Sequence, residues 1–144
     1  MIFSDMTQFA YFAKEIWPMS KPGHWHHPTG FGTLGYALPA AIGGAIGRPS
    51  LPRAAIIGDY GFQYSLPELG VAAEFGLSLP IILWDNTKLQ EIEDSMISAQ
   101  IAPQAMQALN PNFSTLAKAY GCAACKPSLL ADLPGIIEAA FCAG

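Results

Sequence analysis

The fold is decided by two stretches, Ile56-Ile57-Gly58-Asp59-Tyr60-Gly61-Phe62 and Pro80-Ile81-Ile82-Leu83-Trp84-Asp85-Asn86. Each begins as a short run rich in Ile or Leu, as expected of a strand that is covered on both faces, and each ends in polar residues. One segment of helical length, residues 65–75, lies between them. A strand, a helix and a second strand form a βαβ unit with parallel strands. We therefore predict a three-layer α/β/α fold with a mostly parallel central sheet.

Asp59 and Asn86 follow these two predicted strands directly. The carboxyl ends of parallel strands share one edge of the sheet, where open α/β folds bind ligands. Two oxygen donors at that edge suit a hard cation that holds a phosphorylated ligand, and Gly61 can direct backbone N–H groups at phosphate oxygens. Taken singly, Gly58-Asp59 or Asp85-Asn86 would indicate only a turn.

The composition predicts one domain, residues 1–144, with much of its surface covered by other protein. The chain is 51% hydrophobic and only 12% charged, against about a quarter in average proteins. A net charge of −4 without a basic cluster argues against nucleic-acid binding. No apolar run has the length of a membrane span. The chain opens inside a predicted strand and stops after a predicted helix, so we expect truncation at both ends.

The three cysteines, Cys122, Cys125 and Cys142, are an odd number in a chain without a secretory signal. This favours reduced thiols and a cytoplasmic location. The single Cys122-Ala123-Ala124-Cys125 motif is a weak signal for a redox or zinc site, and we expect two buried thiols.

Helices and strands elsewhere are expected from apolar periodicity, capping residues and breakers, with Gly76 and Gly121 expected to end two of the helices. Asp5-Met6-Thr7 could cap the first helix, and Ser65 with Glu68 forms a capping box. Small residues on the second helix predict close packing in the core. Residues 24–29 are expected to be a loop. The predicted elements are strands at residues 1–4, 53–58, 80–84 and 122–126, and helices at residues 8–17, 36–46, 65–75, 89–100, 113–120 and 129–141.

Two further patterns have alternatives. Gly30, Gly32 and Gly35 match a dinucleotide-binding fingerprint, but a Pro- and His-rich loop precedes them where a strand is required. These glycines more plausibly bring the backbone against a flat ligand. The histidines of the loop, His24, His26 and His27, lack a nearby cysteine or carboxylate, so a role near a substrate is favoured over a metal site.

Glu91, Asp94 and Ser95 share one face of the predicted helix at residues 89–100. They form either an ordinary solvated face, with acids near a helix N-terminus, or an acidic wall for a cationic substrate tail. Both readings stay open.

The stretch Gly30-Phe31-Gly32-Thr33-Leu34-Gly35-Tyr36-Ala37-Leu38-Pro39-Ala40-Ala41-Ile42-Gly43, with Gly58-Asp59 and Asp85-Asn86, resembles the C-terminal cofactor domain of thiamine-diphosphate-dependent enzymes. The branch is that of acetolactate synthase and the 2-oxoacid decarboxylases. Residues 62–100 are most similar to the decarboxylases of 5-guanidino-2-oxopentanoate. The resemblance covers nearly the whole chain.

The resemblance implies thiamine diphosphate and Mg²⁺ as cofactors and a 2-oxoacid as substrate. It implies Asp59, the Asn86 side chain and the Lys88 carbonyl as metal ligands. The implied cofactor-binding residues are Gly32, Thr33, Leu34, Gly58, Asp59, Tyr60, Gly61, Asn86 and Leu89. The Gly32 carbonyl and the Leu34 N–H would meet the aminopyrimidine, and the Leu34 side chain would support the bent cofactor. Glu91, Asp94 and Ser95 would face the substrate.

The resemblance also implies that this chain builds half of an active site. The family's activating glutamate lies in a pyrimidine-binding domain of the same or a neighbouring chain, so no catalytic residue is expected here, and a homo-oligomer is expected. Alone, the chain should bind cofactor weakly or not at all. Tyr60 replaces the family's usual Gly and could restrict the loop backbone, and Asp85 replaces an Asn. An acetolactate synthase-like carboligase or a non-catalytic cofactor-binding fragment are the alternatives.

Overall fold

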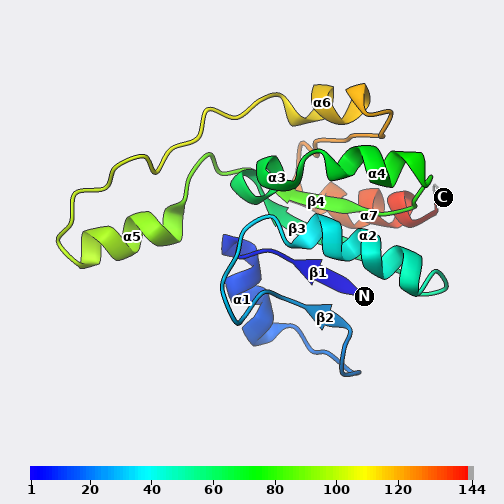
Figure 1. Cartoon of the computed structure of the whole chain (residues 1–144), viewed down its shortest axis with the longest axis horizontal. Coiled ribbons are helices and arrows are strands. Elements are labelled where there is room, and N and C mark those ends of the chain that lie inside the picture. The colour runs from blue at the N-terminus through cyan, green and yellow to red at the C-terminus, as the bar shows by residue number, and fades with distance from the viewer. Residues whose placement is uncertain (143–144) are drawn as a thin grey trace.

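A four-stranded parallel sheet forms the centre of the computed structural model, which describes residues 1–142 (Figure 1). Its strands are β1 (Ile2–Ser4), β2 (Trp25–His26), β3 (Ala54–Gly58) and β4 (Ile81–Trp84), in the spatial order β2-β1-β3-β4. β3 and β4 pair in parallel with Ile56 opposite Ile82. The predicted βαβ unit and its parallel strands are therefore confirmed.

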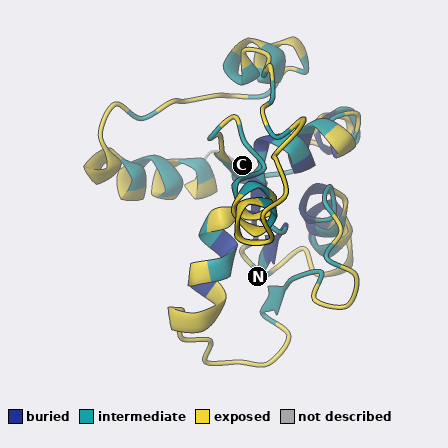
Figure 2. Ribbon diagram, turned by 90° about the vertical axis from the view of Figure 1, so that its left-hand side faces the viewer, coloured by how far each residue is buried: buried dark blue, intermediate teal, exposed yellow. Residues whose placement is uncertain are grey.

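Helices cover both faces of the sheet (Figure 2). The helical elements are α1 (Gln8–Ile16), α2 (Ala37–Gly47), α3 (Asp59–Ser65), α4 (Glu68–Glu74), α5 (Gln90–Ser98), α6 (Phe113–Ala119), the 3₁₀ turn η1 (Leu130–Asp132) and α7 (Leu133–Cys142). The chain moves one way from β1 to β2 and then back across β1 to β3, so right-handed crossovers place α1 and α2 on opposite faces. The three-layer α/β/α prediction is confirmed. Among residues 1–142, no helix combines the length and apolarity needed to cross a membrane.

The small-residue helix α2 packs tightly in the core, as its sequence predicts. Ala37, Ala41 and Ala45 are buried on one side. On the same helix, a Cβ built at Gly44 would overlap the ring of Phe3 on β1, at 2.8 Å from its Cε2 atom. Glycine therefore lets α2 approach the sheet closely enough for the Phe3 ring to fill the space between them.

The predicted capping box at Ser65 is wrong. A helix, α3, begins directly after β3 and includes Ser65, whose hydroxyl donates to the Gly61 carbonyl at 3.2 Å. Pro67 has no N–H to continue this helix and precedes α4, which starts at Glu68. The segment after β3 therefore forms two short helices. The first of them, α3, packs against the core through the buried Phe62 side chain.

Four other expectations are also wrong. Part of the expected loop at residues 24–29 forms the edge strand β2. Residues 122–126, expected to be a strand, have no regular structure, and Cys125 is exposed rather than buried. The Cys122 N–H instead closes the end of α6 by donating to the Ala117 carbonyl at 2.9 Å. Thr7 precedes α1 without a side-chain cap. The helix ends predicted at Gly76 and Gly121 are confirmed by their positive φ angles of 58° and 77°.

The substitution Gly44→Ala should destabilise the fold by about 1–3 kcal/mol, because its methyl group must displace the buried Phe3 ring. Gly43→Ala is a matched control on the same helix, where an added Cβ meets nothing within 4 Å. It should be neutral or stabilising by up to about 1 kcal/mol, because alanine favours helices. Urea unfolding followed by circular dichroism measures both, and equal stabilities of the two variants would contradict this packing.

Candidate functional site

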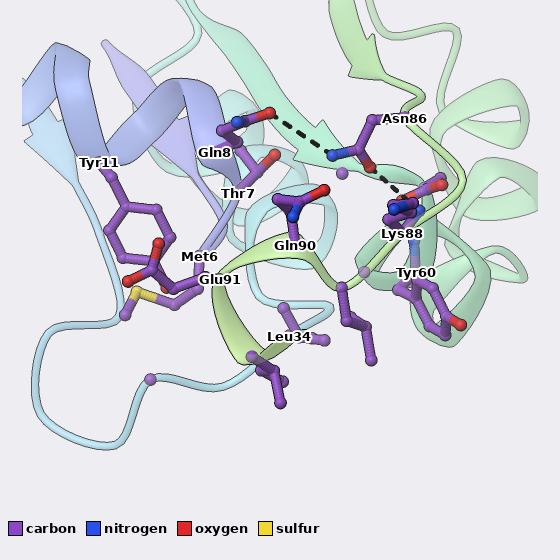
Figure 3. A pocket seen from close by; sticks show the side chains of 16 residues that line it. Met6, Thr7, Gln8, Tyr11, Leu34, Tyr60, Asn86, Lys88, Gln90 and Glu91 are labelled. Atoms are coloured by element: carbon purple, nitrogen blue, oxygen red, sulfur yellow. Dashed lines mark hydrogen bonds between the residues drawn. The ribbon is translucent and has the colours of Figure 1, made fainter. Parts of the chain in front are cut away.

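A cavity of about 220 Å³ lies at the carboxyl edge of the sheet, where the strand order reverses between β1 and β3 (Figure 3). This is the place at which open α/β sheets bind ligands. The segments after β1, β3 and β4 all contribute to its wall, together with the loop before α2. The lining residues are Met6, Thr7, Gln8, Tyr11, Gly32, Leu34, Gly58, Asp59, Tyr60, Gly61, Asn86, Lys88, Leu89, Gln90, Glu91 and Ile92.

Most of the predicted cofactor-binding residues meet in this cavity. The residues that line it are Gly32, Leu34, Gly58, Asp59, Tyr60, Gly61, Asn86 and Leu89, together with the predicted metal ligand Lys88. Thr33 does not line it, and its hydroxyl donates to the Leu34 carbonyl at 3.2 Å. Tyr60 lies in the first turn of α3, where its φ is negative. Its side chain therefore does not restrict the backbone there, contrary to expectation.

Asp59 is a buried carboxylate at the N-terminus of α3, with 3% of its surface exposed. Its Oδ1 accepts from the Tyr60 N–H at 3.0 Å, and its Oδ2 accepts from Asn110 Nδ2 at 2.6 Å. In the described part of the chain the single salt bridge joins Lys88 to Glu93, so no basic side chain pairs with Asp59. Buried carboxylates are normally paired with a cation or bound to a metal. The negative charge of the Asp59 carboxylate is therefore available to a bound cation.

The donors around Asp59 fit an oxygen-seeking metal. Residues 1–142 contain no cluster of three or more His, Cys, Asp or Glu side chains that could hold a metal. A metal here would therefore have to draw on amide and carbonyl oxygens, such as those of Asn86 and Lys88, which line the same cavity. Carboxylate, amide and carbonyl oxygens are ligands that Mg²⁺ accepts, whereas zinc and copper favour nitrogen and sulfur.

The loop of residues 86–89 is strained and held by polar contacts. Thr87 has a φ of 58°, which is rare for a β-branched residue and typical of ligand-binding segments. The Asn86 side chain accepts from the Lys88 N–H at 3.3 Å and donates to Gln8 Oε1 at 3.5 Å (Figure 3). The amide at the end of β4 is thus oriented by its own loop and by α1.

Asp5 joins the two halves of the cavity wall. Its fully buried carboxylate accepts from the Gly35 N–H at 2.8 Å and the Ala37 N–H at 2.7 Å, so it caps α2 rather than α1. Burial raises the pKa of the Asp5 carboxyl, while these backbone hydrogen bonds act in the opposite direction. A Cβ built at Gly61 would overlap Oδ2 of Asp5 and lie 3.2 Å from its Cγ. Asp5 therefore fixes the loop before α2 against the start of α3.

The three histidines do not line this cavity, so it gives no support to the substrate role that we favoured for them. The His26 ring stacks on Phe3, with ring centroids 4.7 Å apart. His27 Nδ1 is 2.9 Å from the hydroxyl oxygen of Ser4, and burial lowers the pKa of His27. Neither they nor His24 lines the cavity. His26 and His27 support the β1–β2 edge of the sheet.

The acidic face of α5 reaches the cavity only in part. Glu91 lines the cavity, whereas Asp94 and Ser95 do not. Asp94 Oδ1 instead accepts from Gln90 Nε2 at 2.9 Å. α5 has no buried residues and extends from the body of the domain (Figure 1).

Sequence reasoning missed part of the site. Met6, Gln8 and Tyr11 line the cavity because β1, like β3 and β4, ends at its rim. The rule applied to Asp59 and Asn86 points to the segment that follows the strand at residues 1–4. Which side chains of the next helix reach the cavity depends on how that helix packs on the sheet. Asn110 carried no comparable signal, because its contact with Asp59 spans 51 positions of the chain.

Comparison with known proteins connects this geometry to one family. Residues 5–144 match the family described as thiamine pyrophosphate enzyme, C-terminal TPP binding domain. The probable 2-ketoarginine decarboxylase AruI of Pseudomonas aeruginosa is 41% identical over 97% of this chain and 25% of its own length. The acetolactate synthase large subunit of Haemophilus influenzae is 30% identical over 97% of this chain and 25% of its own length. The chain thus spans about a quarter of these curated relatives.

Solved structures agree on the fold. The thiamine diphosphate-dependent 4-hydroxybenzoylformate decarboxylase of Rhodococcus jostii RHA1 superposes with a TM-score of 0.88 at 22% identity, over 99% of this chain and 27% of that one. The benzoylformate decarboxylase of Polynucleobacter necessarius gives a TM-score of 0.89 at 19% identity, over 99% of this chain and 28% of that one. Neither these matches nor the short β2, which ends before the glycine loop, supports the dinucleotide-binding alternative.

Gly61→Ala should destabilise the domain by about 3 kcal/mol, because its Cβ would overlap the buried and hydrogen-bonded Asp5 carboxylate. Gly70→Ala is the matched control, since a Cβ there lies 3.6 Å from Tyr120, an ordinary contact. Thermal unfolding of both variants measures the difference. A Gly61→Ala protein as stable as Gly70→Ala would contradict the contact between Asp5 and the start of α3.

Proposed function

Because this chain belongs to the C-terminal thiamine pyrophosphate-binding domain family of thiamine pyrophosphate enzymes, we propose that its cavity binds the Mg²⁺ ion and the diphosphate of thiamine diphosphate. The observation that carries this proposal is Asp59, a buried carboxylate that lines the same cavity as Asn86 and has no basic partner among residues 1–142. A divalent cation would balance that charge and bridge it to diphosphate oxygens.

Asp59, the Asn86 amide oxygen and the Lys88 carbonyl are the metal ligands in this proposal. Each of the three residues lines the cavity. They come from the ends of β3 and β4, which neighbour each other in the sheet. Backbone N–H groups of Tyr60 and Gly61, in the first turn of α3, would meet the diphosphate, and Gly58 precedes them where a small residue allows close approach.

The opposite wall of the cavity would hold the rings of the cofactor. Gly32 and Leu34 line it from the loop before α2, and Leu89 lines it from the loop after β4. The Gly32 carbonyl would accept from the aminopyrimidine amine, the Leu34 N–H would bond the same ring, and the Leu34 side chain would support the bent cofactor. Thr33 would contribute through its backbone, since its side chain does not line the cavity.

The bound cofactor would supply a thiazolium ring that takes up the electron pair released when CO₂ leaves a 2-oxoacid. This chain's part is to hold and orient that group. The cavity of about 220 Å³ is smaller than the roughly 300–1,000 Å³ of complete small-molecule sites. This agrees with a half-site completed by a pyrimidine-binding domain of the same or a neighbouring chain, which would bring the activating glutamate. We expect the chain alone to bind cofactor weakly and to have no turnover.

For the substrate we propose a 2-oxoacid with a cationic tail, such as 5-guanidino-2-oxopentanoate. Glu91 supports this because its carboxylate stands at the cavity wall, and the similarity to a probable 2-ketoarginine decarboxylase points the same way. Asp94 and Ser95 lie farther along the same helix. Three free cysteines suit a cytoplasmic enzyme, and exposed apolar side chains such as Phe12 and Phe31 suit a homo-oligomer.

Asp59→Asn should weaken Mg²⁺-dependent binding of thiamine diphosphate by more than about 100-fold. Loss of an outer-shell hydrogen-bond partner typically weakens metal binding by about 10–100-fold, and loss of a ligand should weaken it more. Isothermal titration calorimetry with thiamine diphosphate, with and without Mg²⁺, measures the change on each chain combined with the pyrimidine-binding part of the enzyme, a state in which wild type binds the cofactor. Glu74→Gln is the control, since it removes the same charge from an exposed position on α4 outside the cavity. Equal binding by wild type and Asp59→Asn would refute the metal site.

Glu91→Lys should lower kcat/KM for 5-guanidino-2-oxopentanoate by about 10-fold or more relative to pyruvate, because the charge facing the guanidinium is reversed. The assay uses the chain together with the pyrimidine-binding part of the enzyme, and product analysis separates decarboxylation from acetolactate formation. An equal loss with both substrates would show that Glu91 does not select the tail. Acetolactate as the main product would favour the carboligase alternative.

A further inference from the structure

Residues 106–110, here called the return segment, run back alongside the loop of residues 86–89. Two backbone hydrogen bonds cross between them, from the Leu89 N–H to the Met106 carbonyl at 2.9 Å and from the Ala108 N–H to the Thr87 carbonyl at 2.9 Å. The loop that carries two of the proposed metal ligands is therefore supported from outside the sheet by a segment about twenty positions later in the chain.

The side chain of Asn110, at the end of the return segment, joins the ends of β3 and β4. Its Nδ2 donates to Asp59 Oδ2 at 2.6 Å and to Asp85 Oδ1 at 2.8 Å. Its Oδ1 accepts from Gln63 Nε2 at 3.0 Å. Turning the amide over would set an oxygen against two carboxylates, so this network fixes its orientation.

This contact leaves Asp59 free to bind a cation. A carboxylate has about four lone-pair positions, and among residues 1–142 only the Tyr60 N–H and Asn110 Nδ2 donate to the Asp59 side chain. Lone pairs remain on both of its oxygens. In metal sites, hydrogen-bond donors of this kind hold a ligating carboxylate in the orientation that the metal needs.

We propose that Asn110 is a positioning residue of the magnesium site: it holds the Asp59 carboxylate in one orientation and fastens the return segment against residues 86–89. This inference rests on the proposed function and adds a residue that is not itself a ligand. An amide suits the position because it donates to Asp59 and Asp85 together without adding a third negative charge beside them.

The test compares the 144-residue wild type with Asn110→Ala and Asn110→Leu. Mg²⁺ is titrated in the presence of thiamine diphosphate and followed by the NMR signals of the Asp59 and Lys88 backbone amides, which detect weak binding. Both variants should bind Mg²⁺ about 10–100-fold more weakly than wild type. Leucine keeps most of the side-chain volume and removes the donors, so it separates hydrogen bonding from packing.

Hydrogen exchange without metal provides a second readout. Both Asn110 variants should exchange the Leu89 and Ala108 amides faster than wild type, because the return segment loses its anchor. Asn112→Ala is the control: Asn112 accepts from the Thr115 N–H at 2.9 Å and caps α6, whereas the side-chain hydrogen bonds to Asp59 and Asp85 come from Asn110. It should leave both Mg²⁺ binding and these two amides unchanged.

The wild-type titration distinguishes failure of the Asn110 inference from failure of the proposed function. If wild type binds Mg²⁺ and both Asn110 variants bind it equally well, this inference is overturned and the proposed function stands. An Asn112→Ala protein as impaired as the Asn110 variants would also overturn it, since the effect would then be general destabilisation. If wild type binds no Mg²⁺ with thiamine diphosphate even when it is combined with the pyrimidine-binding part of the enzyme, the proposed function fails and this inference with it.

Discussion

The buried carboxylate of Asp5 is the interaction on which the rest of the site depends. It follows β1 directly and accepts from two backbone N–H groups at the start of α2. It also lies against Gly61, where a side chain would overlap it. One side chain thus sets the spacing between the loop that carries Gly32 and Leu34 and the first turn of α3. A carboxylate suits this role, because both hydrogen bonds that it accepts come from backbone N–H groups.

Asp5 and Asp59 are both buried carboxylates after neighbouring strands, but their surroundings differ. The two oxygens of Asp5 are taken up by backbone donors from another element of the fold, so its burial is explained by the fold. Asp59 accepts from its own helix and from Asn110, and it forms no salt bridge within the described part of the chain. Protein structure normally balances a buried charge. The difference explains why one of the two is structural and the other is the centre of the proposed metal site.

Local patterns predicted the parts of the fold that depend on local physics. Continuous apolar runs predicted β3 and β4, small residues predicted the close packing of α2, and glycines predicted two helix ends. The failures arose where a tertiary contact outweighed a local signal. Ser65 looked like a helix cap but lies at the end of α3, because Phe62 is drawn into the core. Trp25 and His26 form an edge strand because β1 offers them a partner. Residues 122–126 found no such partner in the described part of the chain.

The sequence by itself determined the family, the parallel order of the central strands and the meeting of Asp59 with Asn86 at one edge. These follow from hydrophobic periodicity and from the rule that parallel strands end on the same side. Tertiary structure alone decided that Asp5 caps α2, that Gln8 and Tyr11 line the cavity, and that Asn110 bridges Asp59 and Asp85. Those contacts join residues 25 to 51 positions apart or depend on which helix packs on which face. The folded geometry decides which residues form these contacts, and no periodic pattern in the sequence indicates them.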